Sequence, residues 1–356
     1  MNSPVKDNEP HRFSPPNLRG PNNEGILALI LLGLIIVMSL LNPVFFSVST
    51  LFAIFRSSIV PLIFALGVLL VIISGGIDVS FAAIAIFAGY TTVTAFSSGA
   101  FGAGLVGAVL LALAIGAALG LINGVVIARF RLPTLIVTLG TQGIFKGALL
   151  TFVGSRFIAD LPNAIAGLST TNLISVATAS GRAYLHVMVI PTVLLCCAMA
   201  WMLHRTMFGR SIYAIGGDAE AARRAGFHVV RTQILLYVLV GMTAALGGLI
   251  YIIMGRSASP QDLVGTELDI IAAVVLGGAS IFGGRGSVLG TILGVLLVQV
   301  IGNSLILAGV PSAWQRAAVG TLLIIGVGVQ AVSAKRRRKR QPSADGPDLT
   351  QEAMTV

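Results

Sequence analysis

The chain has 356 residues, of which 56% are hydrophobic and only 10% charged, and its formal net charge is +10. Soluble domains carry about 25% charged residues, so this composition excludes an ordinary soluble protein and indicates one embedded in a bilayer. The apolar runs are continuous, whereas a transmembrane β-barrel needs alternating segments of about 10 residues, so we expect an all-α polytopic membrane protein.

The two ends of the chain are polar. Residues 1–25 contain five prolines and predict a disordered cytoplasmic tail. Residues 334–356 open with the basic run Lys335–Arg340, which is typical of a stop-transfer anchor beside anionic lipid and is followed by a polar cytoplasmic tail. Residues 26–333, between these tails, form the expected transmembrane domain.

Membrane-length apolar runs fill that domain and predict about ten transmembrane helices, some broken by glycine. The runs lie at about 26–41, 51–73, 80–97, 102–128, 133–153, 187–204, 232–254, 267–282, 287–309 and 313–333. The segment 154–186 is rich in Ser, Thr, Ala and Gly. We expect it to be a re-entrant or surface-lying external segment rather than a folded domain.

The distribution of lysine and arginine predicts the orientation. If the N-terminus is cytoplasmic and the runs alternate, 17 of the 23 basic residues fall on the cytoplasmic side. Cytoplasmic loops carry such an excess of positive charge, so both termini and the loop 206–231 are expected in the cytoplasm. Topology thereby accounts for the basic charge, and no nucleic-acid partner is expected.

Two glycine breaks interrupt the apolar pattern in similar ways. The first is Gly75-Gly76-Ile77-Asp78-Val79-Ser80. The second runs from Gly277-Gly278-Ala279-Ser280 through Gly283-Gly284-Arg285-Gly286-Ser287. Two halves with interrupted helices often mark a transport pathway. We therefore assign a translocation path or gate to the small and polar residues of both breaks, namely Gly75, Gly76, Asp78, Ser80, Gly277, Gly278 and Ser280.

Asp78 is the most informative ionisable residue. A charge near membrane depth is costly and indicates function by default. A structural role is also open, because Asp78 or Ser80 can cap the helix that begins near Val79, where the helix dipole favours an anion. The two roles are compatible.

Two further polar groups interrupt apolar runs. The residues concerned are Thr138, Thr141, Gln142, Gln299 and Asn303. Such side chains either hydrogen-bond between neighbouring helices or line a hydrophilic path for a hydroxyl-rich solute. The scarcity of buried charge argues against an ion-coupled pump, and we include these residues in the candidate path.

Glycines spaced by four predict two close-packing seams. They are Gly116, Gly120 and Gly124 in one run, and Gly286, Gly290 and Gly294 in another. The seams could form within the chain or across a dimer.

Catalytic and ligand motifs are missing. No lysine follows a glycine, which excludes a P-loop, and the four histidines lack the spacing of a metalloprotease. Cys196 and Cys197 are adjacent, which leaves neither a disulfide framework nor a CxxC metal site. We therefore expect no catalytic residue, metal or cofactor in this chain.

The cytoplasmic loop contains the run Glu220-Ala221-Ala222-Arg223-Arg224-Ala225-Gly226. Alanine favours a short helix, and Gly226 supplies its C-terminal stop. Two interpretations stay open at this point: an ordinary basic loop, or a surface helix that a soluble partner grips.

A resemblance to a known family rests on the two breaks, on Val137-Thr138-Leu139-Gly140-Thr141, on Gly209-Arg210 through Gly216-Gly217-Asp218, and on the Glu220–Gly226 run. Taken together, these segments resemble the ribose/xylose-type permease subunits of bacterial ABC importers. The resemblance covers residues 40 to 330. It implies an inner-membrane subunit that pairs with a second permease chain as a homo- or heterodimer.

The resemblance also implies a cytoplasmic ATPase pair, which uses ATP and Mg, and a periplasmic binding protein that delivers a sugar or sugar-like polyol. The residues that match the ATPase-coupling segment are Glu220, Ala221, Ala222, Arg223 and Gly226. Two other functions remain open: a permease for another small solute such as an amino acid, and a facilitator that works without ATP.

Overall fold

The computed structural model describes residues 24–97, 104–178 and 181–307, with single positions between 309 and 328. The expected tail 1–25 lies outside this range except for its last two residues, which begin the first helix. The expected tail 334–356 lies wholly outside it, as does most of the run 313–333.

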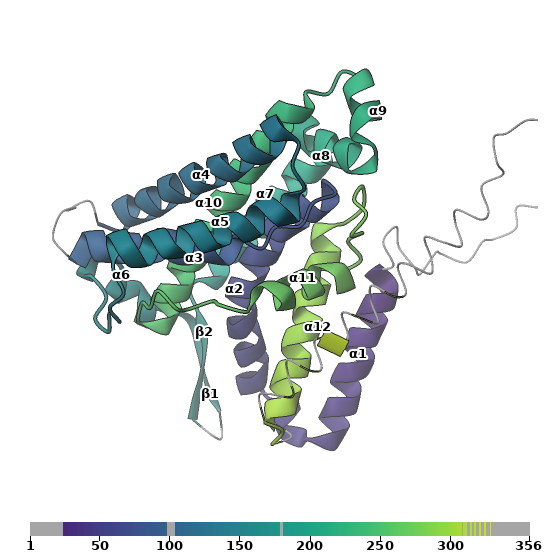
Figure 1. Cartoon of the computed structure of the whole chain (residues 1–356). Coiled ribbons are helices and arrows are strands. Elements are labelled where there is room, and N and C mark those ends of the chain that lie inside the picture. Colours follow the sequence, from purple (N-terminus) through teal and green to yellow (C-terminus); the bar gives the residue numbers. More distant parts are fainter. Residues whose placement is uncertain are drawn as a thin grey trace, which may run out of the picture.

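The described chain is mainly helical (Figure 1). The α-helices are α1 (Glu24–Leu41), α2 (Val48–Ile73), α3 (Phe81–Ser97), α4 (Gly104–Phe130), α5 (Thr134–Ala148), α6 (Asn163–Ala166), α7 (Val189–Arg205), α8 (Met207–Gly217), α9 (Ala219–Arg224), α10 (Val229–Gly255), α11 (Glu267–Leu276) and α12 (Val288–Leu307). Short 3-10 turns lie at Pro43–Phe46 and Gly167–Thr170, and a π-helical turn at Leu149–Val153 continues α5.

Helices α2 and α10 form the centre of the molecule, since most of the residues along each are buried. α2 begins where the side chain of Ser47 accepts a hydrogen bond from the backbone N–H of Thr50, which satisfies a donor that the first turn leaves free. The buried part of α2 is a continuous run of Ile, Leu, Val, Phe and Ala, and it packs against α10.

A glycine seam joins α4 to α10. Gly116 and Gly120 lie against the backbone of Tyr237 and Gly241, and a Cβ atom on either would overlap a carbonyl oxygen of α10. Small residues let helix backbones approach this closely, so dispersion contacts accumulate along the whole interface. The seam expected from the sequence therefore forms within the chain.

The second seam also forms within the chain, but for two of its three glycines, because Gly286 precedes α12 and lies against Ile73 and Leu69 of α2. Gly290 and Gly294 on α12 lie against Gly277 and Ala273 at the end of α11, again at backbone contact. This packing holds the start of α12 beside the second break.

Among the described residues, six helices are long and apolar enough to cross a membrane, or seven if α7 and α8 form one span bent by 72°. This bears out the polytopic helical class but revises three of the expected runs. The runs 80–97 and 187–204 form α3 and α7, each of 17 residues, and 267–282 forms α11, of only 10. α11 is short because the chain turns at Gly277 and Gly278.

The segment 154–186 contains a β-hairpin that was not predicted. β1 (Asn172–Thr178) pairs antiparallel with β2 (Gly181–His186). Figure 1 shows the hairpin at one end of the molecule and α9 at the other. Alternating apolar and polar residues predict a strand with one buried face. β1 has no such face, since it is exposed along most of its length.

Candidate functional site

The first break ends α2 in a tight turn. Gly75 has a positive φ of 85°, and the N–H of Gly76 donates to the carbonyl oxygen of Val71 at 3.0 Å. This pattern is the Schellman motif, in which glycine supplies the left-handed residue that closes a helix. The chain then passes through Ile77 and Val79 without regular secondary structure before α3 begins.

The second break repeats this geometry at the end of α11. Gly278 has a φ of 91°, and the N–H of Ala279 donates to the carbonyl oxygen of Val274 at 3.3 Å. The backbone of Ser280 then accepts from the N–H of Gly283 at 2.9 Å, which begins the turn leading to α12. The similarity that the sequence predicts between the breaks therefore extends to their hydrogen bonds.

The two breaks touch one another and the end of α8. The N–H of Gly284 donates to the carbonyl oxygen of Ile73 at 2.8 Å. A Cβ on Gly216 would overlap that same Ile73 oxygen, and one on Gly283 would lie 2.9 Å from the Cα of Gly75. We call this four-glycine contact of Gly75, Gly216, Gly283 and Gly284 the glycine junction. It joins the two breaks to the helix that precedes α9.

Asp78 caps the turn at Ser80 that leads from the first break into α3. Its Oδ1 accepts from the backbone N–H of Ser80 at 2.7 Å and from the Ser80 hydroxyl at 2.6 Å. Asn123 of α4 donates to that hydroxyl oxygen at 2.8 Å. All three side chains are fully buried, and Asp78 Oδ2 has no hydrogen-bond partner among the described residues. Asp78 therefore caps the turn at Ser80, and not the first turn of α3, which begins one residue later at Phe81.

This capping geometry predicts different results for two substitutions of Asp78. Asp78→Asn keeps the Oδ1 acceptor and should retain most of the thermal stability. Asp78→Ala leaves the Ser80 donors unpaired and should destabilise by about 1–3 kcal/mol. The melting midpoint of the detergent-purified protein measures both. Equal destabilisation by the two variants would mean that the negative charge, and not the cap, is what the fold requires.

The first half of α5 holds the first break in place. Thr134 Oγ1 accepts from the N–H of Ile77 at 3.0 Å, and Thr138 Oγ1 accepts from the N–H of Val79 at 3.4 Å. Thr141 is buried one turn further on and bonds to its own helix. Thr138 thus joins the break, whereas Thr141 serves packing.

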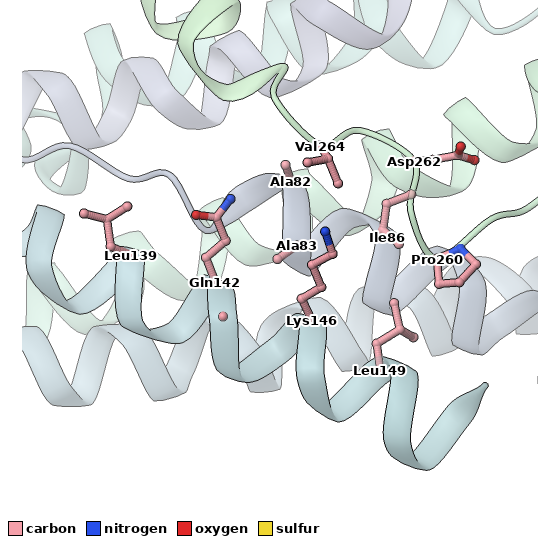
Figure 2. Close-up of a pocket in the computed structure, with 11 residues that line it drawn as sticks. Ala82, Ala83, Ile86, Leu139, Gln142, Lys146, Leu149, Pro260, Asp262 and Val264 are labelled. Atoms are coloured by element: carbon pink, nitrogen blue, oxygen red, sulfur yellow. The ribbon is translucent and has the colours of Figure 1, made fainter. Parts of the chain in front are cut away.

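Gln142 lines a cavity between α3, α5 and the loop 256–266 that precedes α11 (Figure 2). Its Nε2 donates to Glu267 Oε1 at 2.7 Å. The cavity also contains Lys146 and Asp262, which the candidate site did not include. A single lysine inside an otherwise apolar run was a usable signal for Lys146, since charges at that depth are rare.

Gln299 and Asn303 lie elsewhere. Asn303 Nδ2 donates to the backbone oxygen of Gln299 at 2.8 Å and to the Ser57 hydroxyl of α2 at 3.4 Å. Neither residue lines the cavity at Gln142. The structure therefore gives Asn303 a helix-packing role between α12 and α2, and Gln299 takes part through its backbone oxygen. Neither residue is joined to the other path residues.

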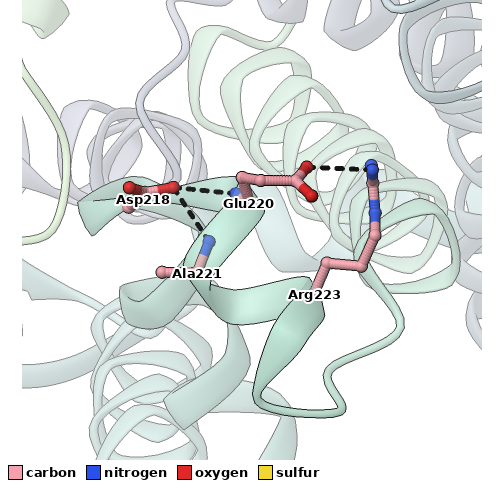
Figure 3. Close-up of polar contacts among 4 residues, drawn as sticks. All are labelled: Asp218, Glu220, Ala221 and Arg223. Carbon is pink, nitrogen blue, oxygen red and sulfur yellow. Dashed lines mark hydrogen bonds and ion pairs between the residues drawn. The ribbon is translucent and has the colours of Figure 1, made fainter.

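The Glu220 run forms the short helix α9. Asp218 begins it, because its Oδ1 accepts from the N–H groups of Glu220 at 2.8 Å and Ala221 at 3.0 Å (Figure 3). Those two bonds stabilise the carboxylate and hold the pKa of Asp218 below its usual value. At the other end Gly226 has a φ of 91°, and the N–H of Phe227 donates to the Ala222 oxygen at 3.1 Å.

Most of α9 faces outward. Ala222 is its one buried residue and packs with Ile215 of α8 and Val229 of α10. Glu220 and Arg223 form an exposed ion pair at 3.0 Å, which contributes little to stability in that setting. Helix α8, which the sequence analysis missed, connects α9 to the rest of the fold. It begins at Thr206, whose Oγ1 accepts from the N–H of Gly209 at 3.0 Å.

Comparison with known proteins identifies the family. Residues 50–327 match the family described as branched-chain amino acid transport system / permease component. The autoinducer 2 import system permease protein LsrC of Yersinia pseudotuberculosis serotype O:3 (strain YPIII) is 34% identical over 306 residues, which cover 86% of this chain and 84% of the relative. The protein of the same name from Yersinia pestis (strain Pestoides F) has the same identity and coverage. No solved structure matches the chain.

The matched region takes in both breaks, the glycine junction and α9. The relatives named above are permease proteins of an import system, and the six or seven candidate spans agree with that role. The chain is therefore a multi-pass inner-membrane protein, and it belongs to the family of branched-chain amino acid transport system permease components, within which it is related to sugar-type ABC permeases.

Proposed function

We propose that this chain is the membrane permease of an ATP-driven importer for a sugar or sugar-like polyol. A periplasmic binding protein delivers the solute, and a cytoplasmic ATPase, using ATP and Mg, docks on α9. The observation that carries the proposal is the exposed helix α9, which directly follows the end of α8 at the glycine junction.

In this proposal α9 is the coupling helix. Glu220, Ala221 and Arg223 present its exposed face to the ATPase, while Ala222 anchors it and Gly226 ends it. Because α8 carries both α9 and Gly216, a displacement of α9 reaches the two breaks through backbone contacts. The breaks then act as the gate, and a second permease chain, identical or different, completes the path.

Co-purification tests the importer proposal. Cells expressing the native operon should yield, with the affinity-tagged chain, an ATPase subunit and a vanadate-sensitive ATPase activity. Glu220→Arg should reduce both, because it reverses the charge of an exposed side chain whose only ion-pair partner among the described residues is Arg223. A permease that purifies without any ATPase in these cells contradicts the proposal and favours an ATP-independent facilitator.

A further inference from the structure

The cavity at Gln142 contains charged groups that neither packing nor capping explains. Its volume is about 280 Å³, close to the lower end of small-ligand sites, which span about 300–1,000 Å³. Figure 2 shows Gln142 and Lys146 pointing from α5 toward α3 and the loop that carries Pro260 and Asp262. Ala82 and Ala83 of α3 form part of the opposite wall.

Lys146 is the strongest indication of a ligand. Its ammonium forms no hydrogen bond or ion pair with any residue that the structure describes, and the residue is half-buried in a helix of membrane-spanning character. A charge at such depth is costly unless it serves a function. The ammonium offers three donors and no acceptor, so its partner must carry acceptor oxygens.

Gln142 contributes an acceptor. Its Nε2 is held by Glu267 Oε1 at 2.7 Å, and Glu267 is itself buried at the start of α11. Because a carboxyl group fixes the amide nitrogen on that side, the amide oxygen of Gln142 remains available to a donor.

Asp262 provides a second acceptor, from the loop. Its Oδ2 accepts from the N–H of Ser259 at 3.2 Å, and Oδ1 has no hydrogen-bond partner among the described residues. Burial raises the pKa of the Asp262 carboxyl. It forms no ion pair with Lys146 in the described structure, so a solute is free to bridge the two groups.

We propose that this cavity is a contact site for a neutral, polyhydroxylated solute, with Lys146 donating to solute oxygens and Gln142 and Asp262 accepting from solute hydroxyls. Lys146 disfavours a net cation, and the carboxyl groups of Asp262 and of Glu267, which holds Gln142, disfavour a net anion. A hydroxyl can accept and donate at once, which suits a cavity that offers both kinds of group. Ile86 and Leu149 offer apolar surface to the C–H face of such a solute. The inference rests on the proposed function and specifies where the imported solute is contacted.

Protection from alkylation tests the site. Cys196→Ala and Cys197→Ala remove the native thiols, and Gly143→Cys places one thiol in the cavity wall, where an added Cβ meets no atom within 4 Å. Membranes from cells expressing the whole operon are treated with N-ethylmaleimide, alone or with saturating D-ribose, D-xylose, D-galactose or ribitol. At least one of these should slow alkylation by about fivefold, which corresponds to occupancy of about 80%.

Gly147→Cys is the matched control. It lies one turn along the same helix, its added Cβ also meets nothing, and it does not line the cavity. Its alkylation should not change with any sugar, and comparable amounts of both variants in the membrane show that both fold. Lys146→Met should abolish protection at Gly143→Cys, whereas Lys146→Arg, which keeps a donor and the charge, should retain part of it.

Three results overturn the inference: no protection by any of the four sugars and polyols, equal protection at both cysteines, or protection that survives Lys146→Met. L-leucine is tested beside these solutes, and protection by L-leucine alone overturns the solute class, since a zwitterion would then be the ligand that matches the paired charges. The importer proposal is judged separately by co-purification. If the complex retains its ATPase but no solute protects the cysteine, only the proposed solute site is refuted. If a solute protects the cysteine but no ATPase co-purifies, only the proposed ATP-driven mechanism is refuted.

Discussion

Gly216→Ala is expected to abolish solute uptake while the protein still reaches the membrane. A Cβ at this position overlaps the carbonyl oxygen of Ile73 and lies 2.7 Å from the N–H nitrogen of Gly284. Those two atoms hydrogen-bond to each other across the breaks, so the methyl group separates α8 from both. Overpacking of this kind typically destabilises by about 1–3 kcal/mol. Uptake by whole cells and the melting midpoint in detergent measure the two effects.

Gly217→Ala provides a control one residue away. It ends the same helix, and its added Cβ meets no atom within 4 Å. Alanine is also the better helix former, so this variant should transport normally and melt at the wild-type temperature or slightly above it. If both alanine variants transport equally well, the glycine junction has no part in the mechanism.

Gly226→Pro is the second substitution with a large expected effect. Gly226 has a φ of 91°, and its N–H donates to the Arg223 oxygen at 3.0 Å. Proline fixes φ near −65° and has no N–H, so the turn that ends α9 cannot form. Loss of uptake and of the co-purifying ATPase should follow, with the protein still present in the membrane.

Gly226→Asn tests whether uptake requires glycine itself or only a residue that can adopt the conformation of this turn. Asparagine adopts the left-handed conformation more readily than other non-glycine residues, and an added Cβ at Gly226 meets no atom within 4 Å. We expect it to keep most of the uptake. Normal uptake by Gly226→Pro, or equal loss in both variants, would contradict a requirement for the geometry of this turn.

Acid should weaken the start of α9 only at low pH. The pKa of Asp218 is lowered in the folded protein by its bonds to the N–H groups of Ala221 and Glu220. The stabilisation is therefore complete above the unfolded-state pKa and is lost as the pH falls through the lowered folded-state value. At neutral pH the cap is fully formed.

Local chemistry explains what the sequence predicted well. The cap at Asp78 and the turn at Gly226 involve residues within a few positions of one another, so residue type and spacing determine them. The seam at Gly116 and Gly120 follows from glycine periodicity alone. The helical membrane class follows from composition.

Long-range geometry explains the rest. Nothing local to Gly216 indicates that it meets Ile73 and Gly284, which are far away in the sequence. Lys146 stands out in its apolar run, but the sequence does not indicate that it shares a cavity with Asp262, which is far away along the chain. Asn303 carries the same polar signal as Gln142, yet its helix places it against Ser57 of α2. Residue type alone does not distinguish a packing contact from a cavity wall.

Because α7 and α8 meet at a bend of 72°, a rotation of α8 about Thr206 would move the far end of that helix. The helix has 11 residues, which is about 16 Å of length. A tilt of about 10° at Thr206 would therefore carry Gly216 sideways by about 3 Å, which is close to a full atomic diameter. If long side chains formed the contact at the far end of α8, they could accommodate this displacement by changing rotamer. The contact at Gly216 is between backbone atoms, which cannot adjust by changing rotamer. The two broken helices would therefore move with α8 or lose their contact with it.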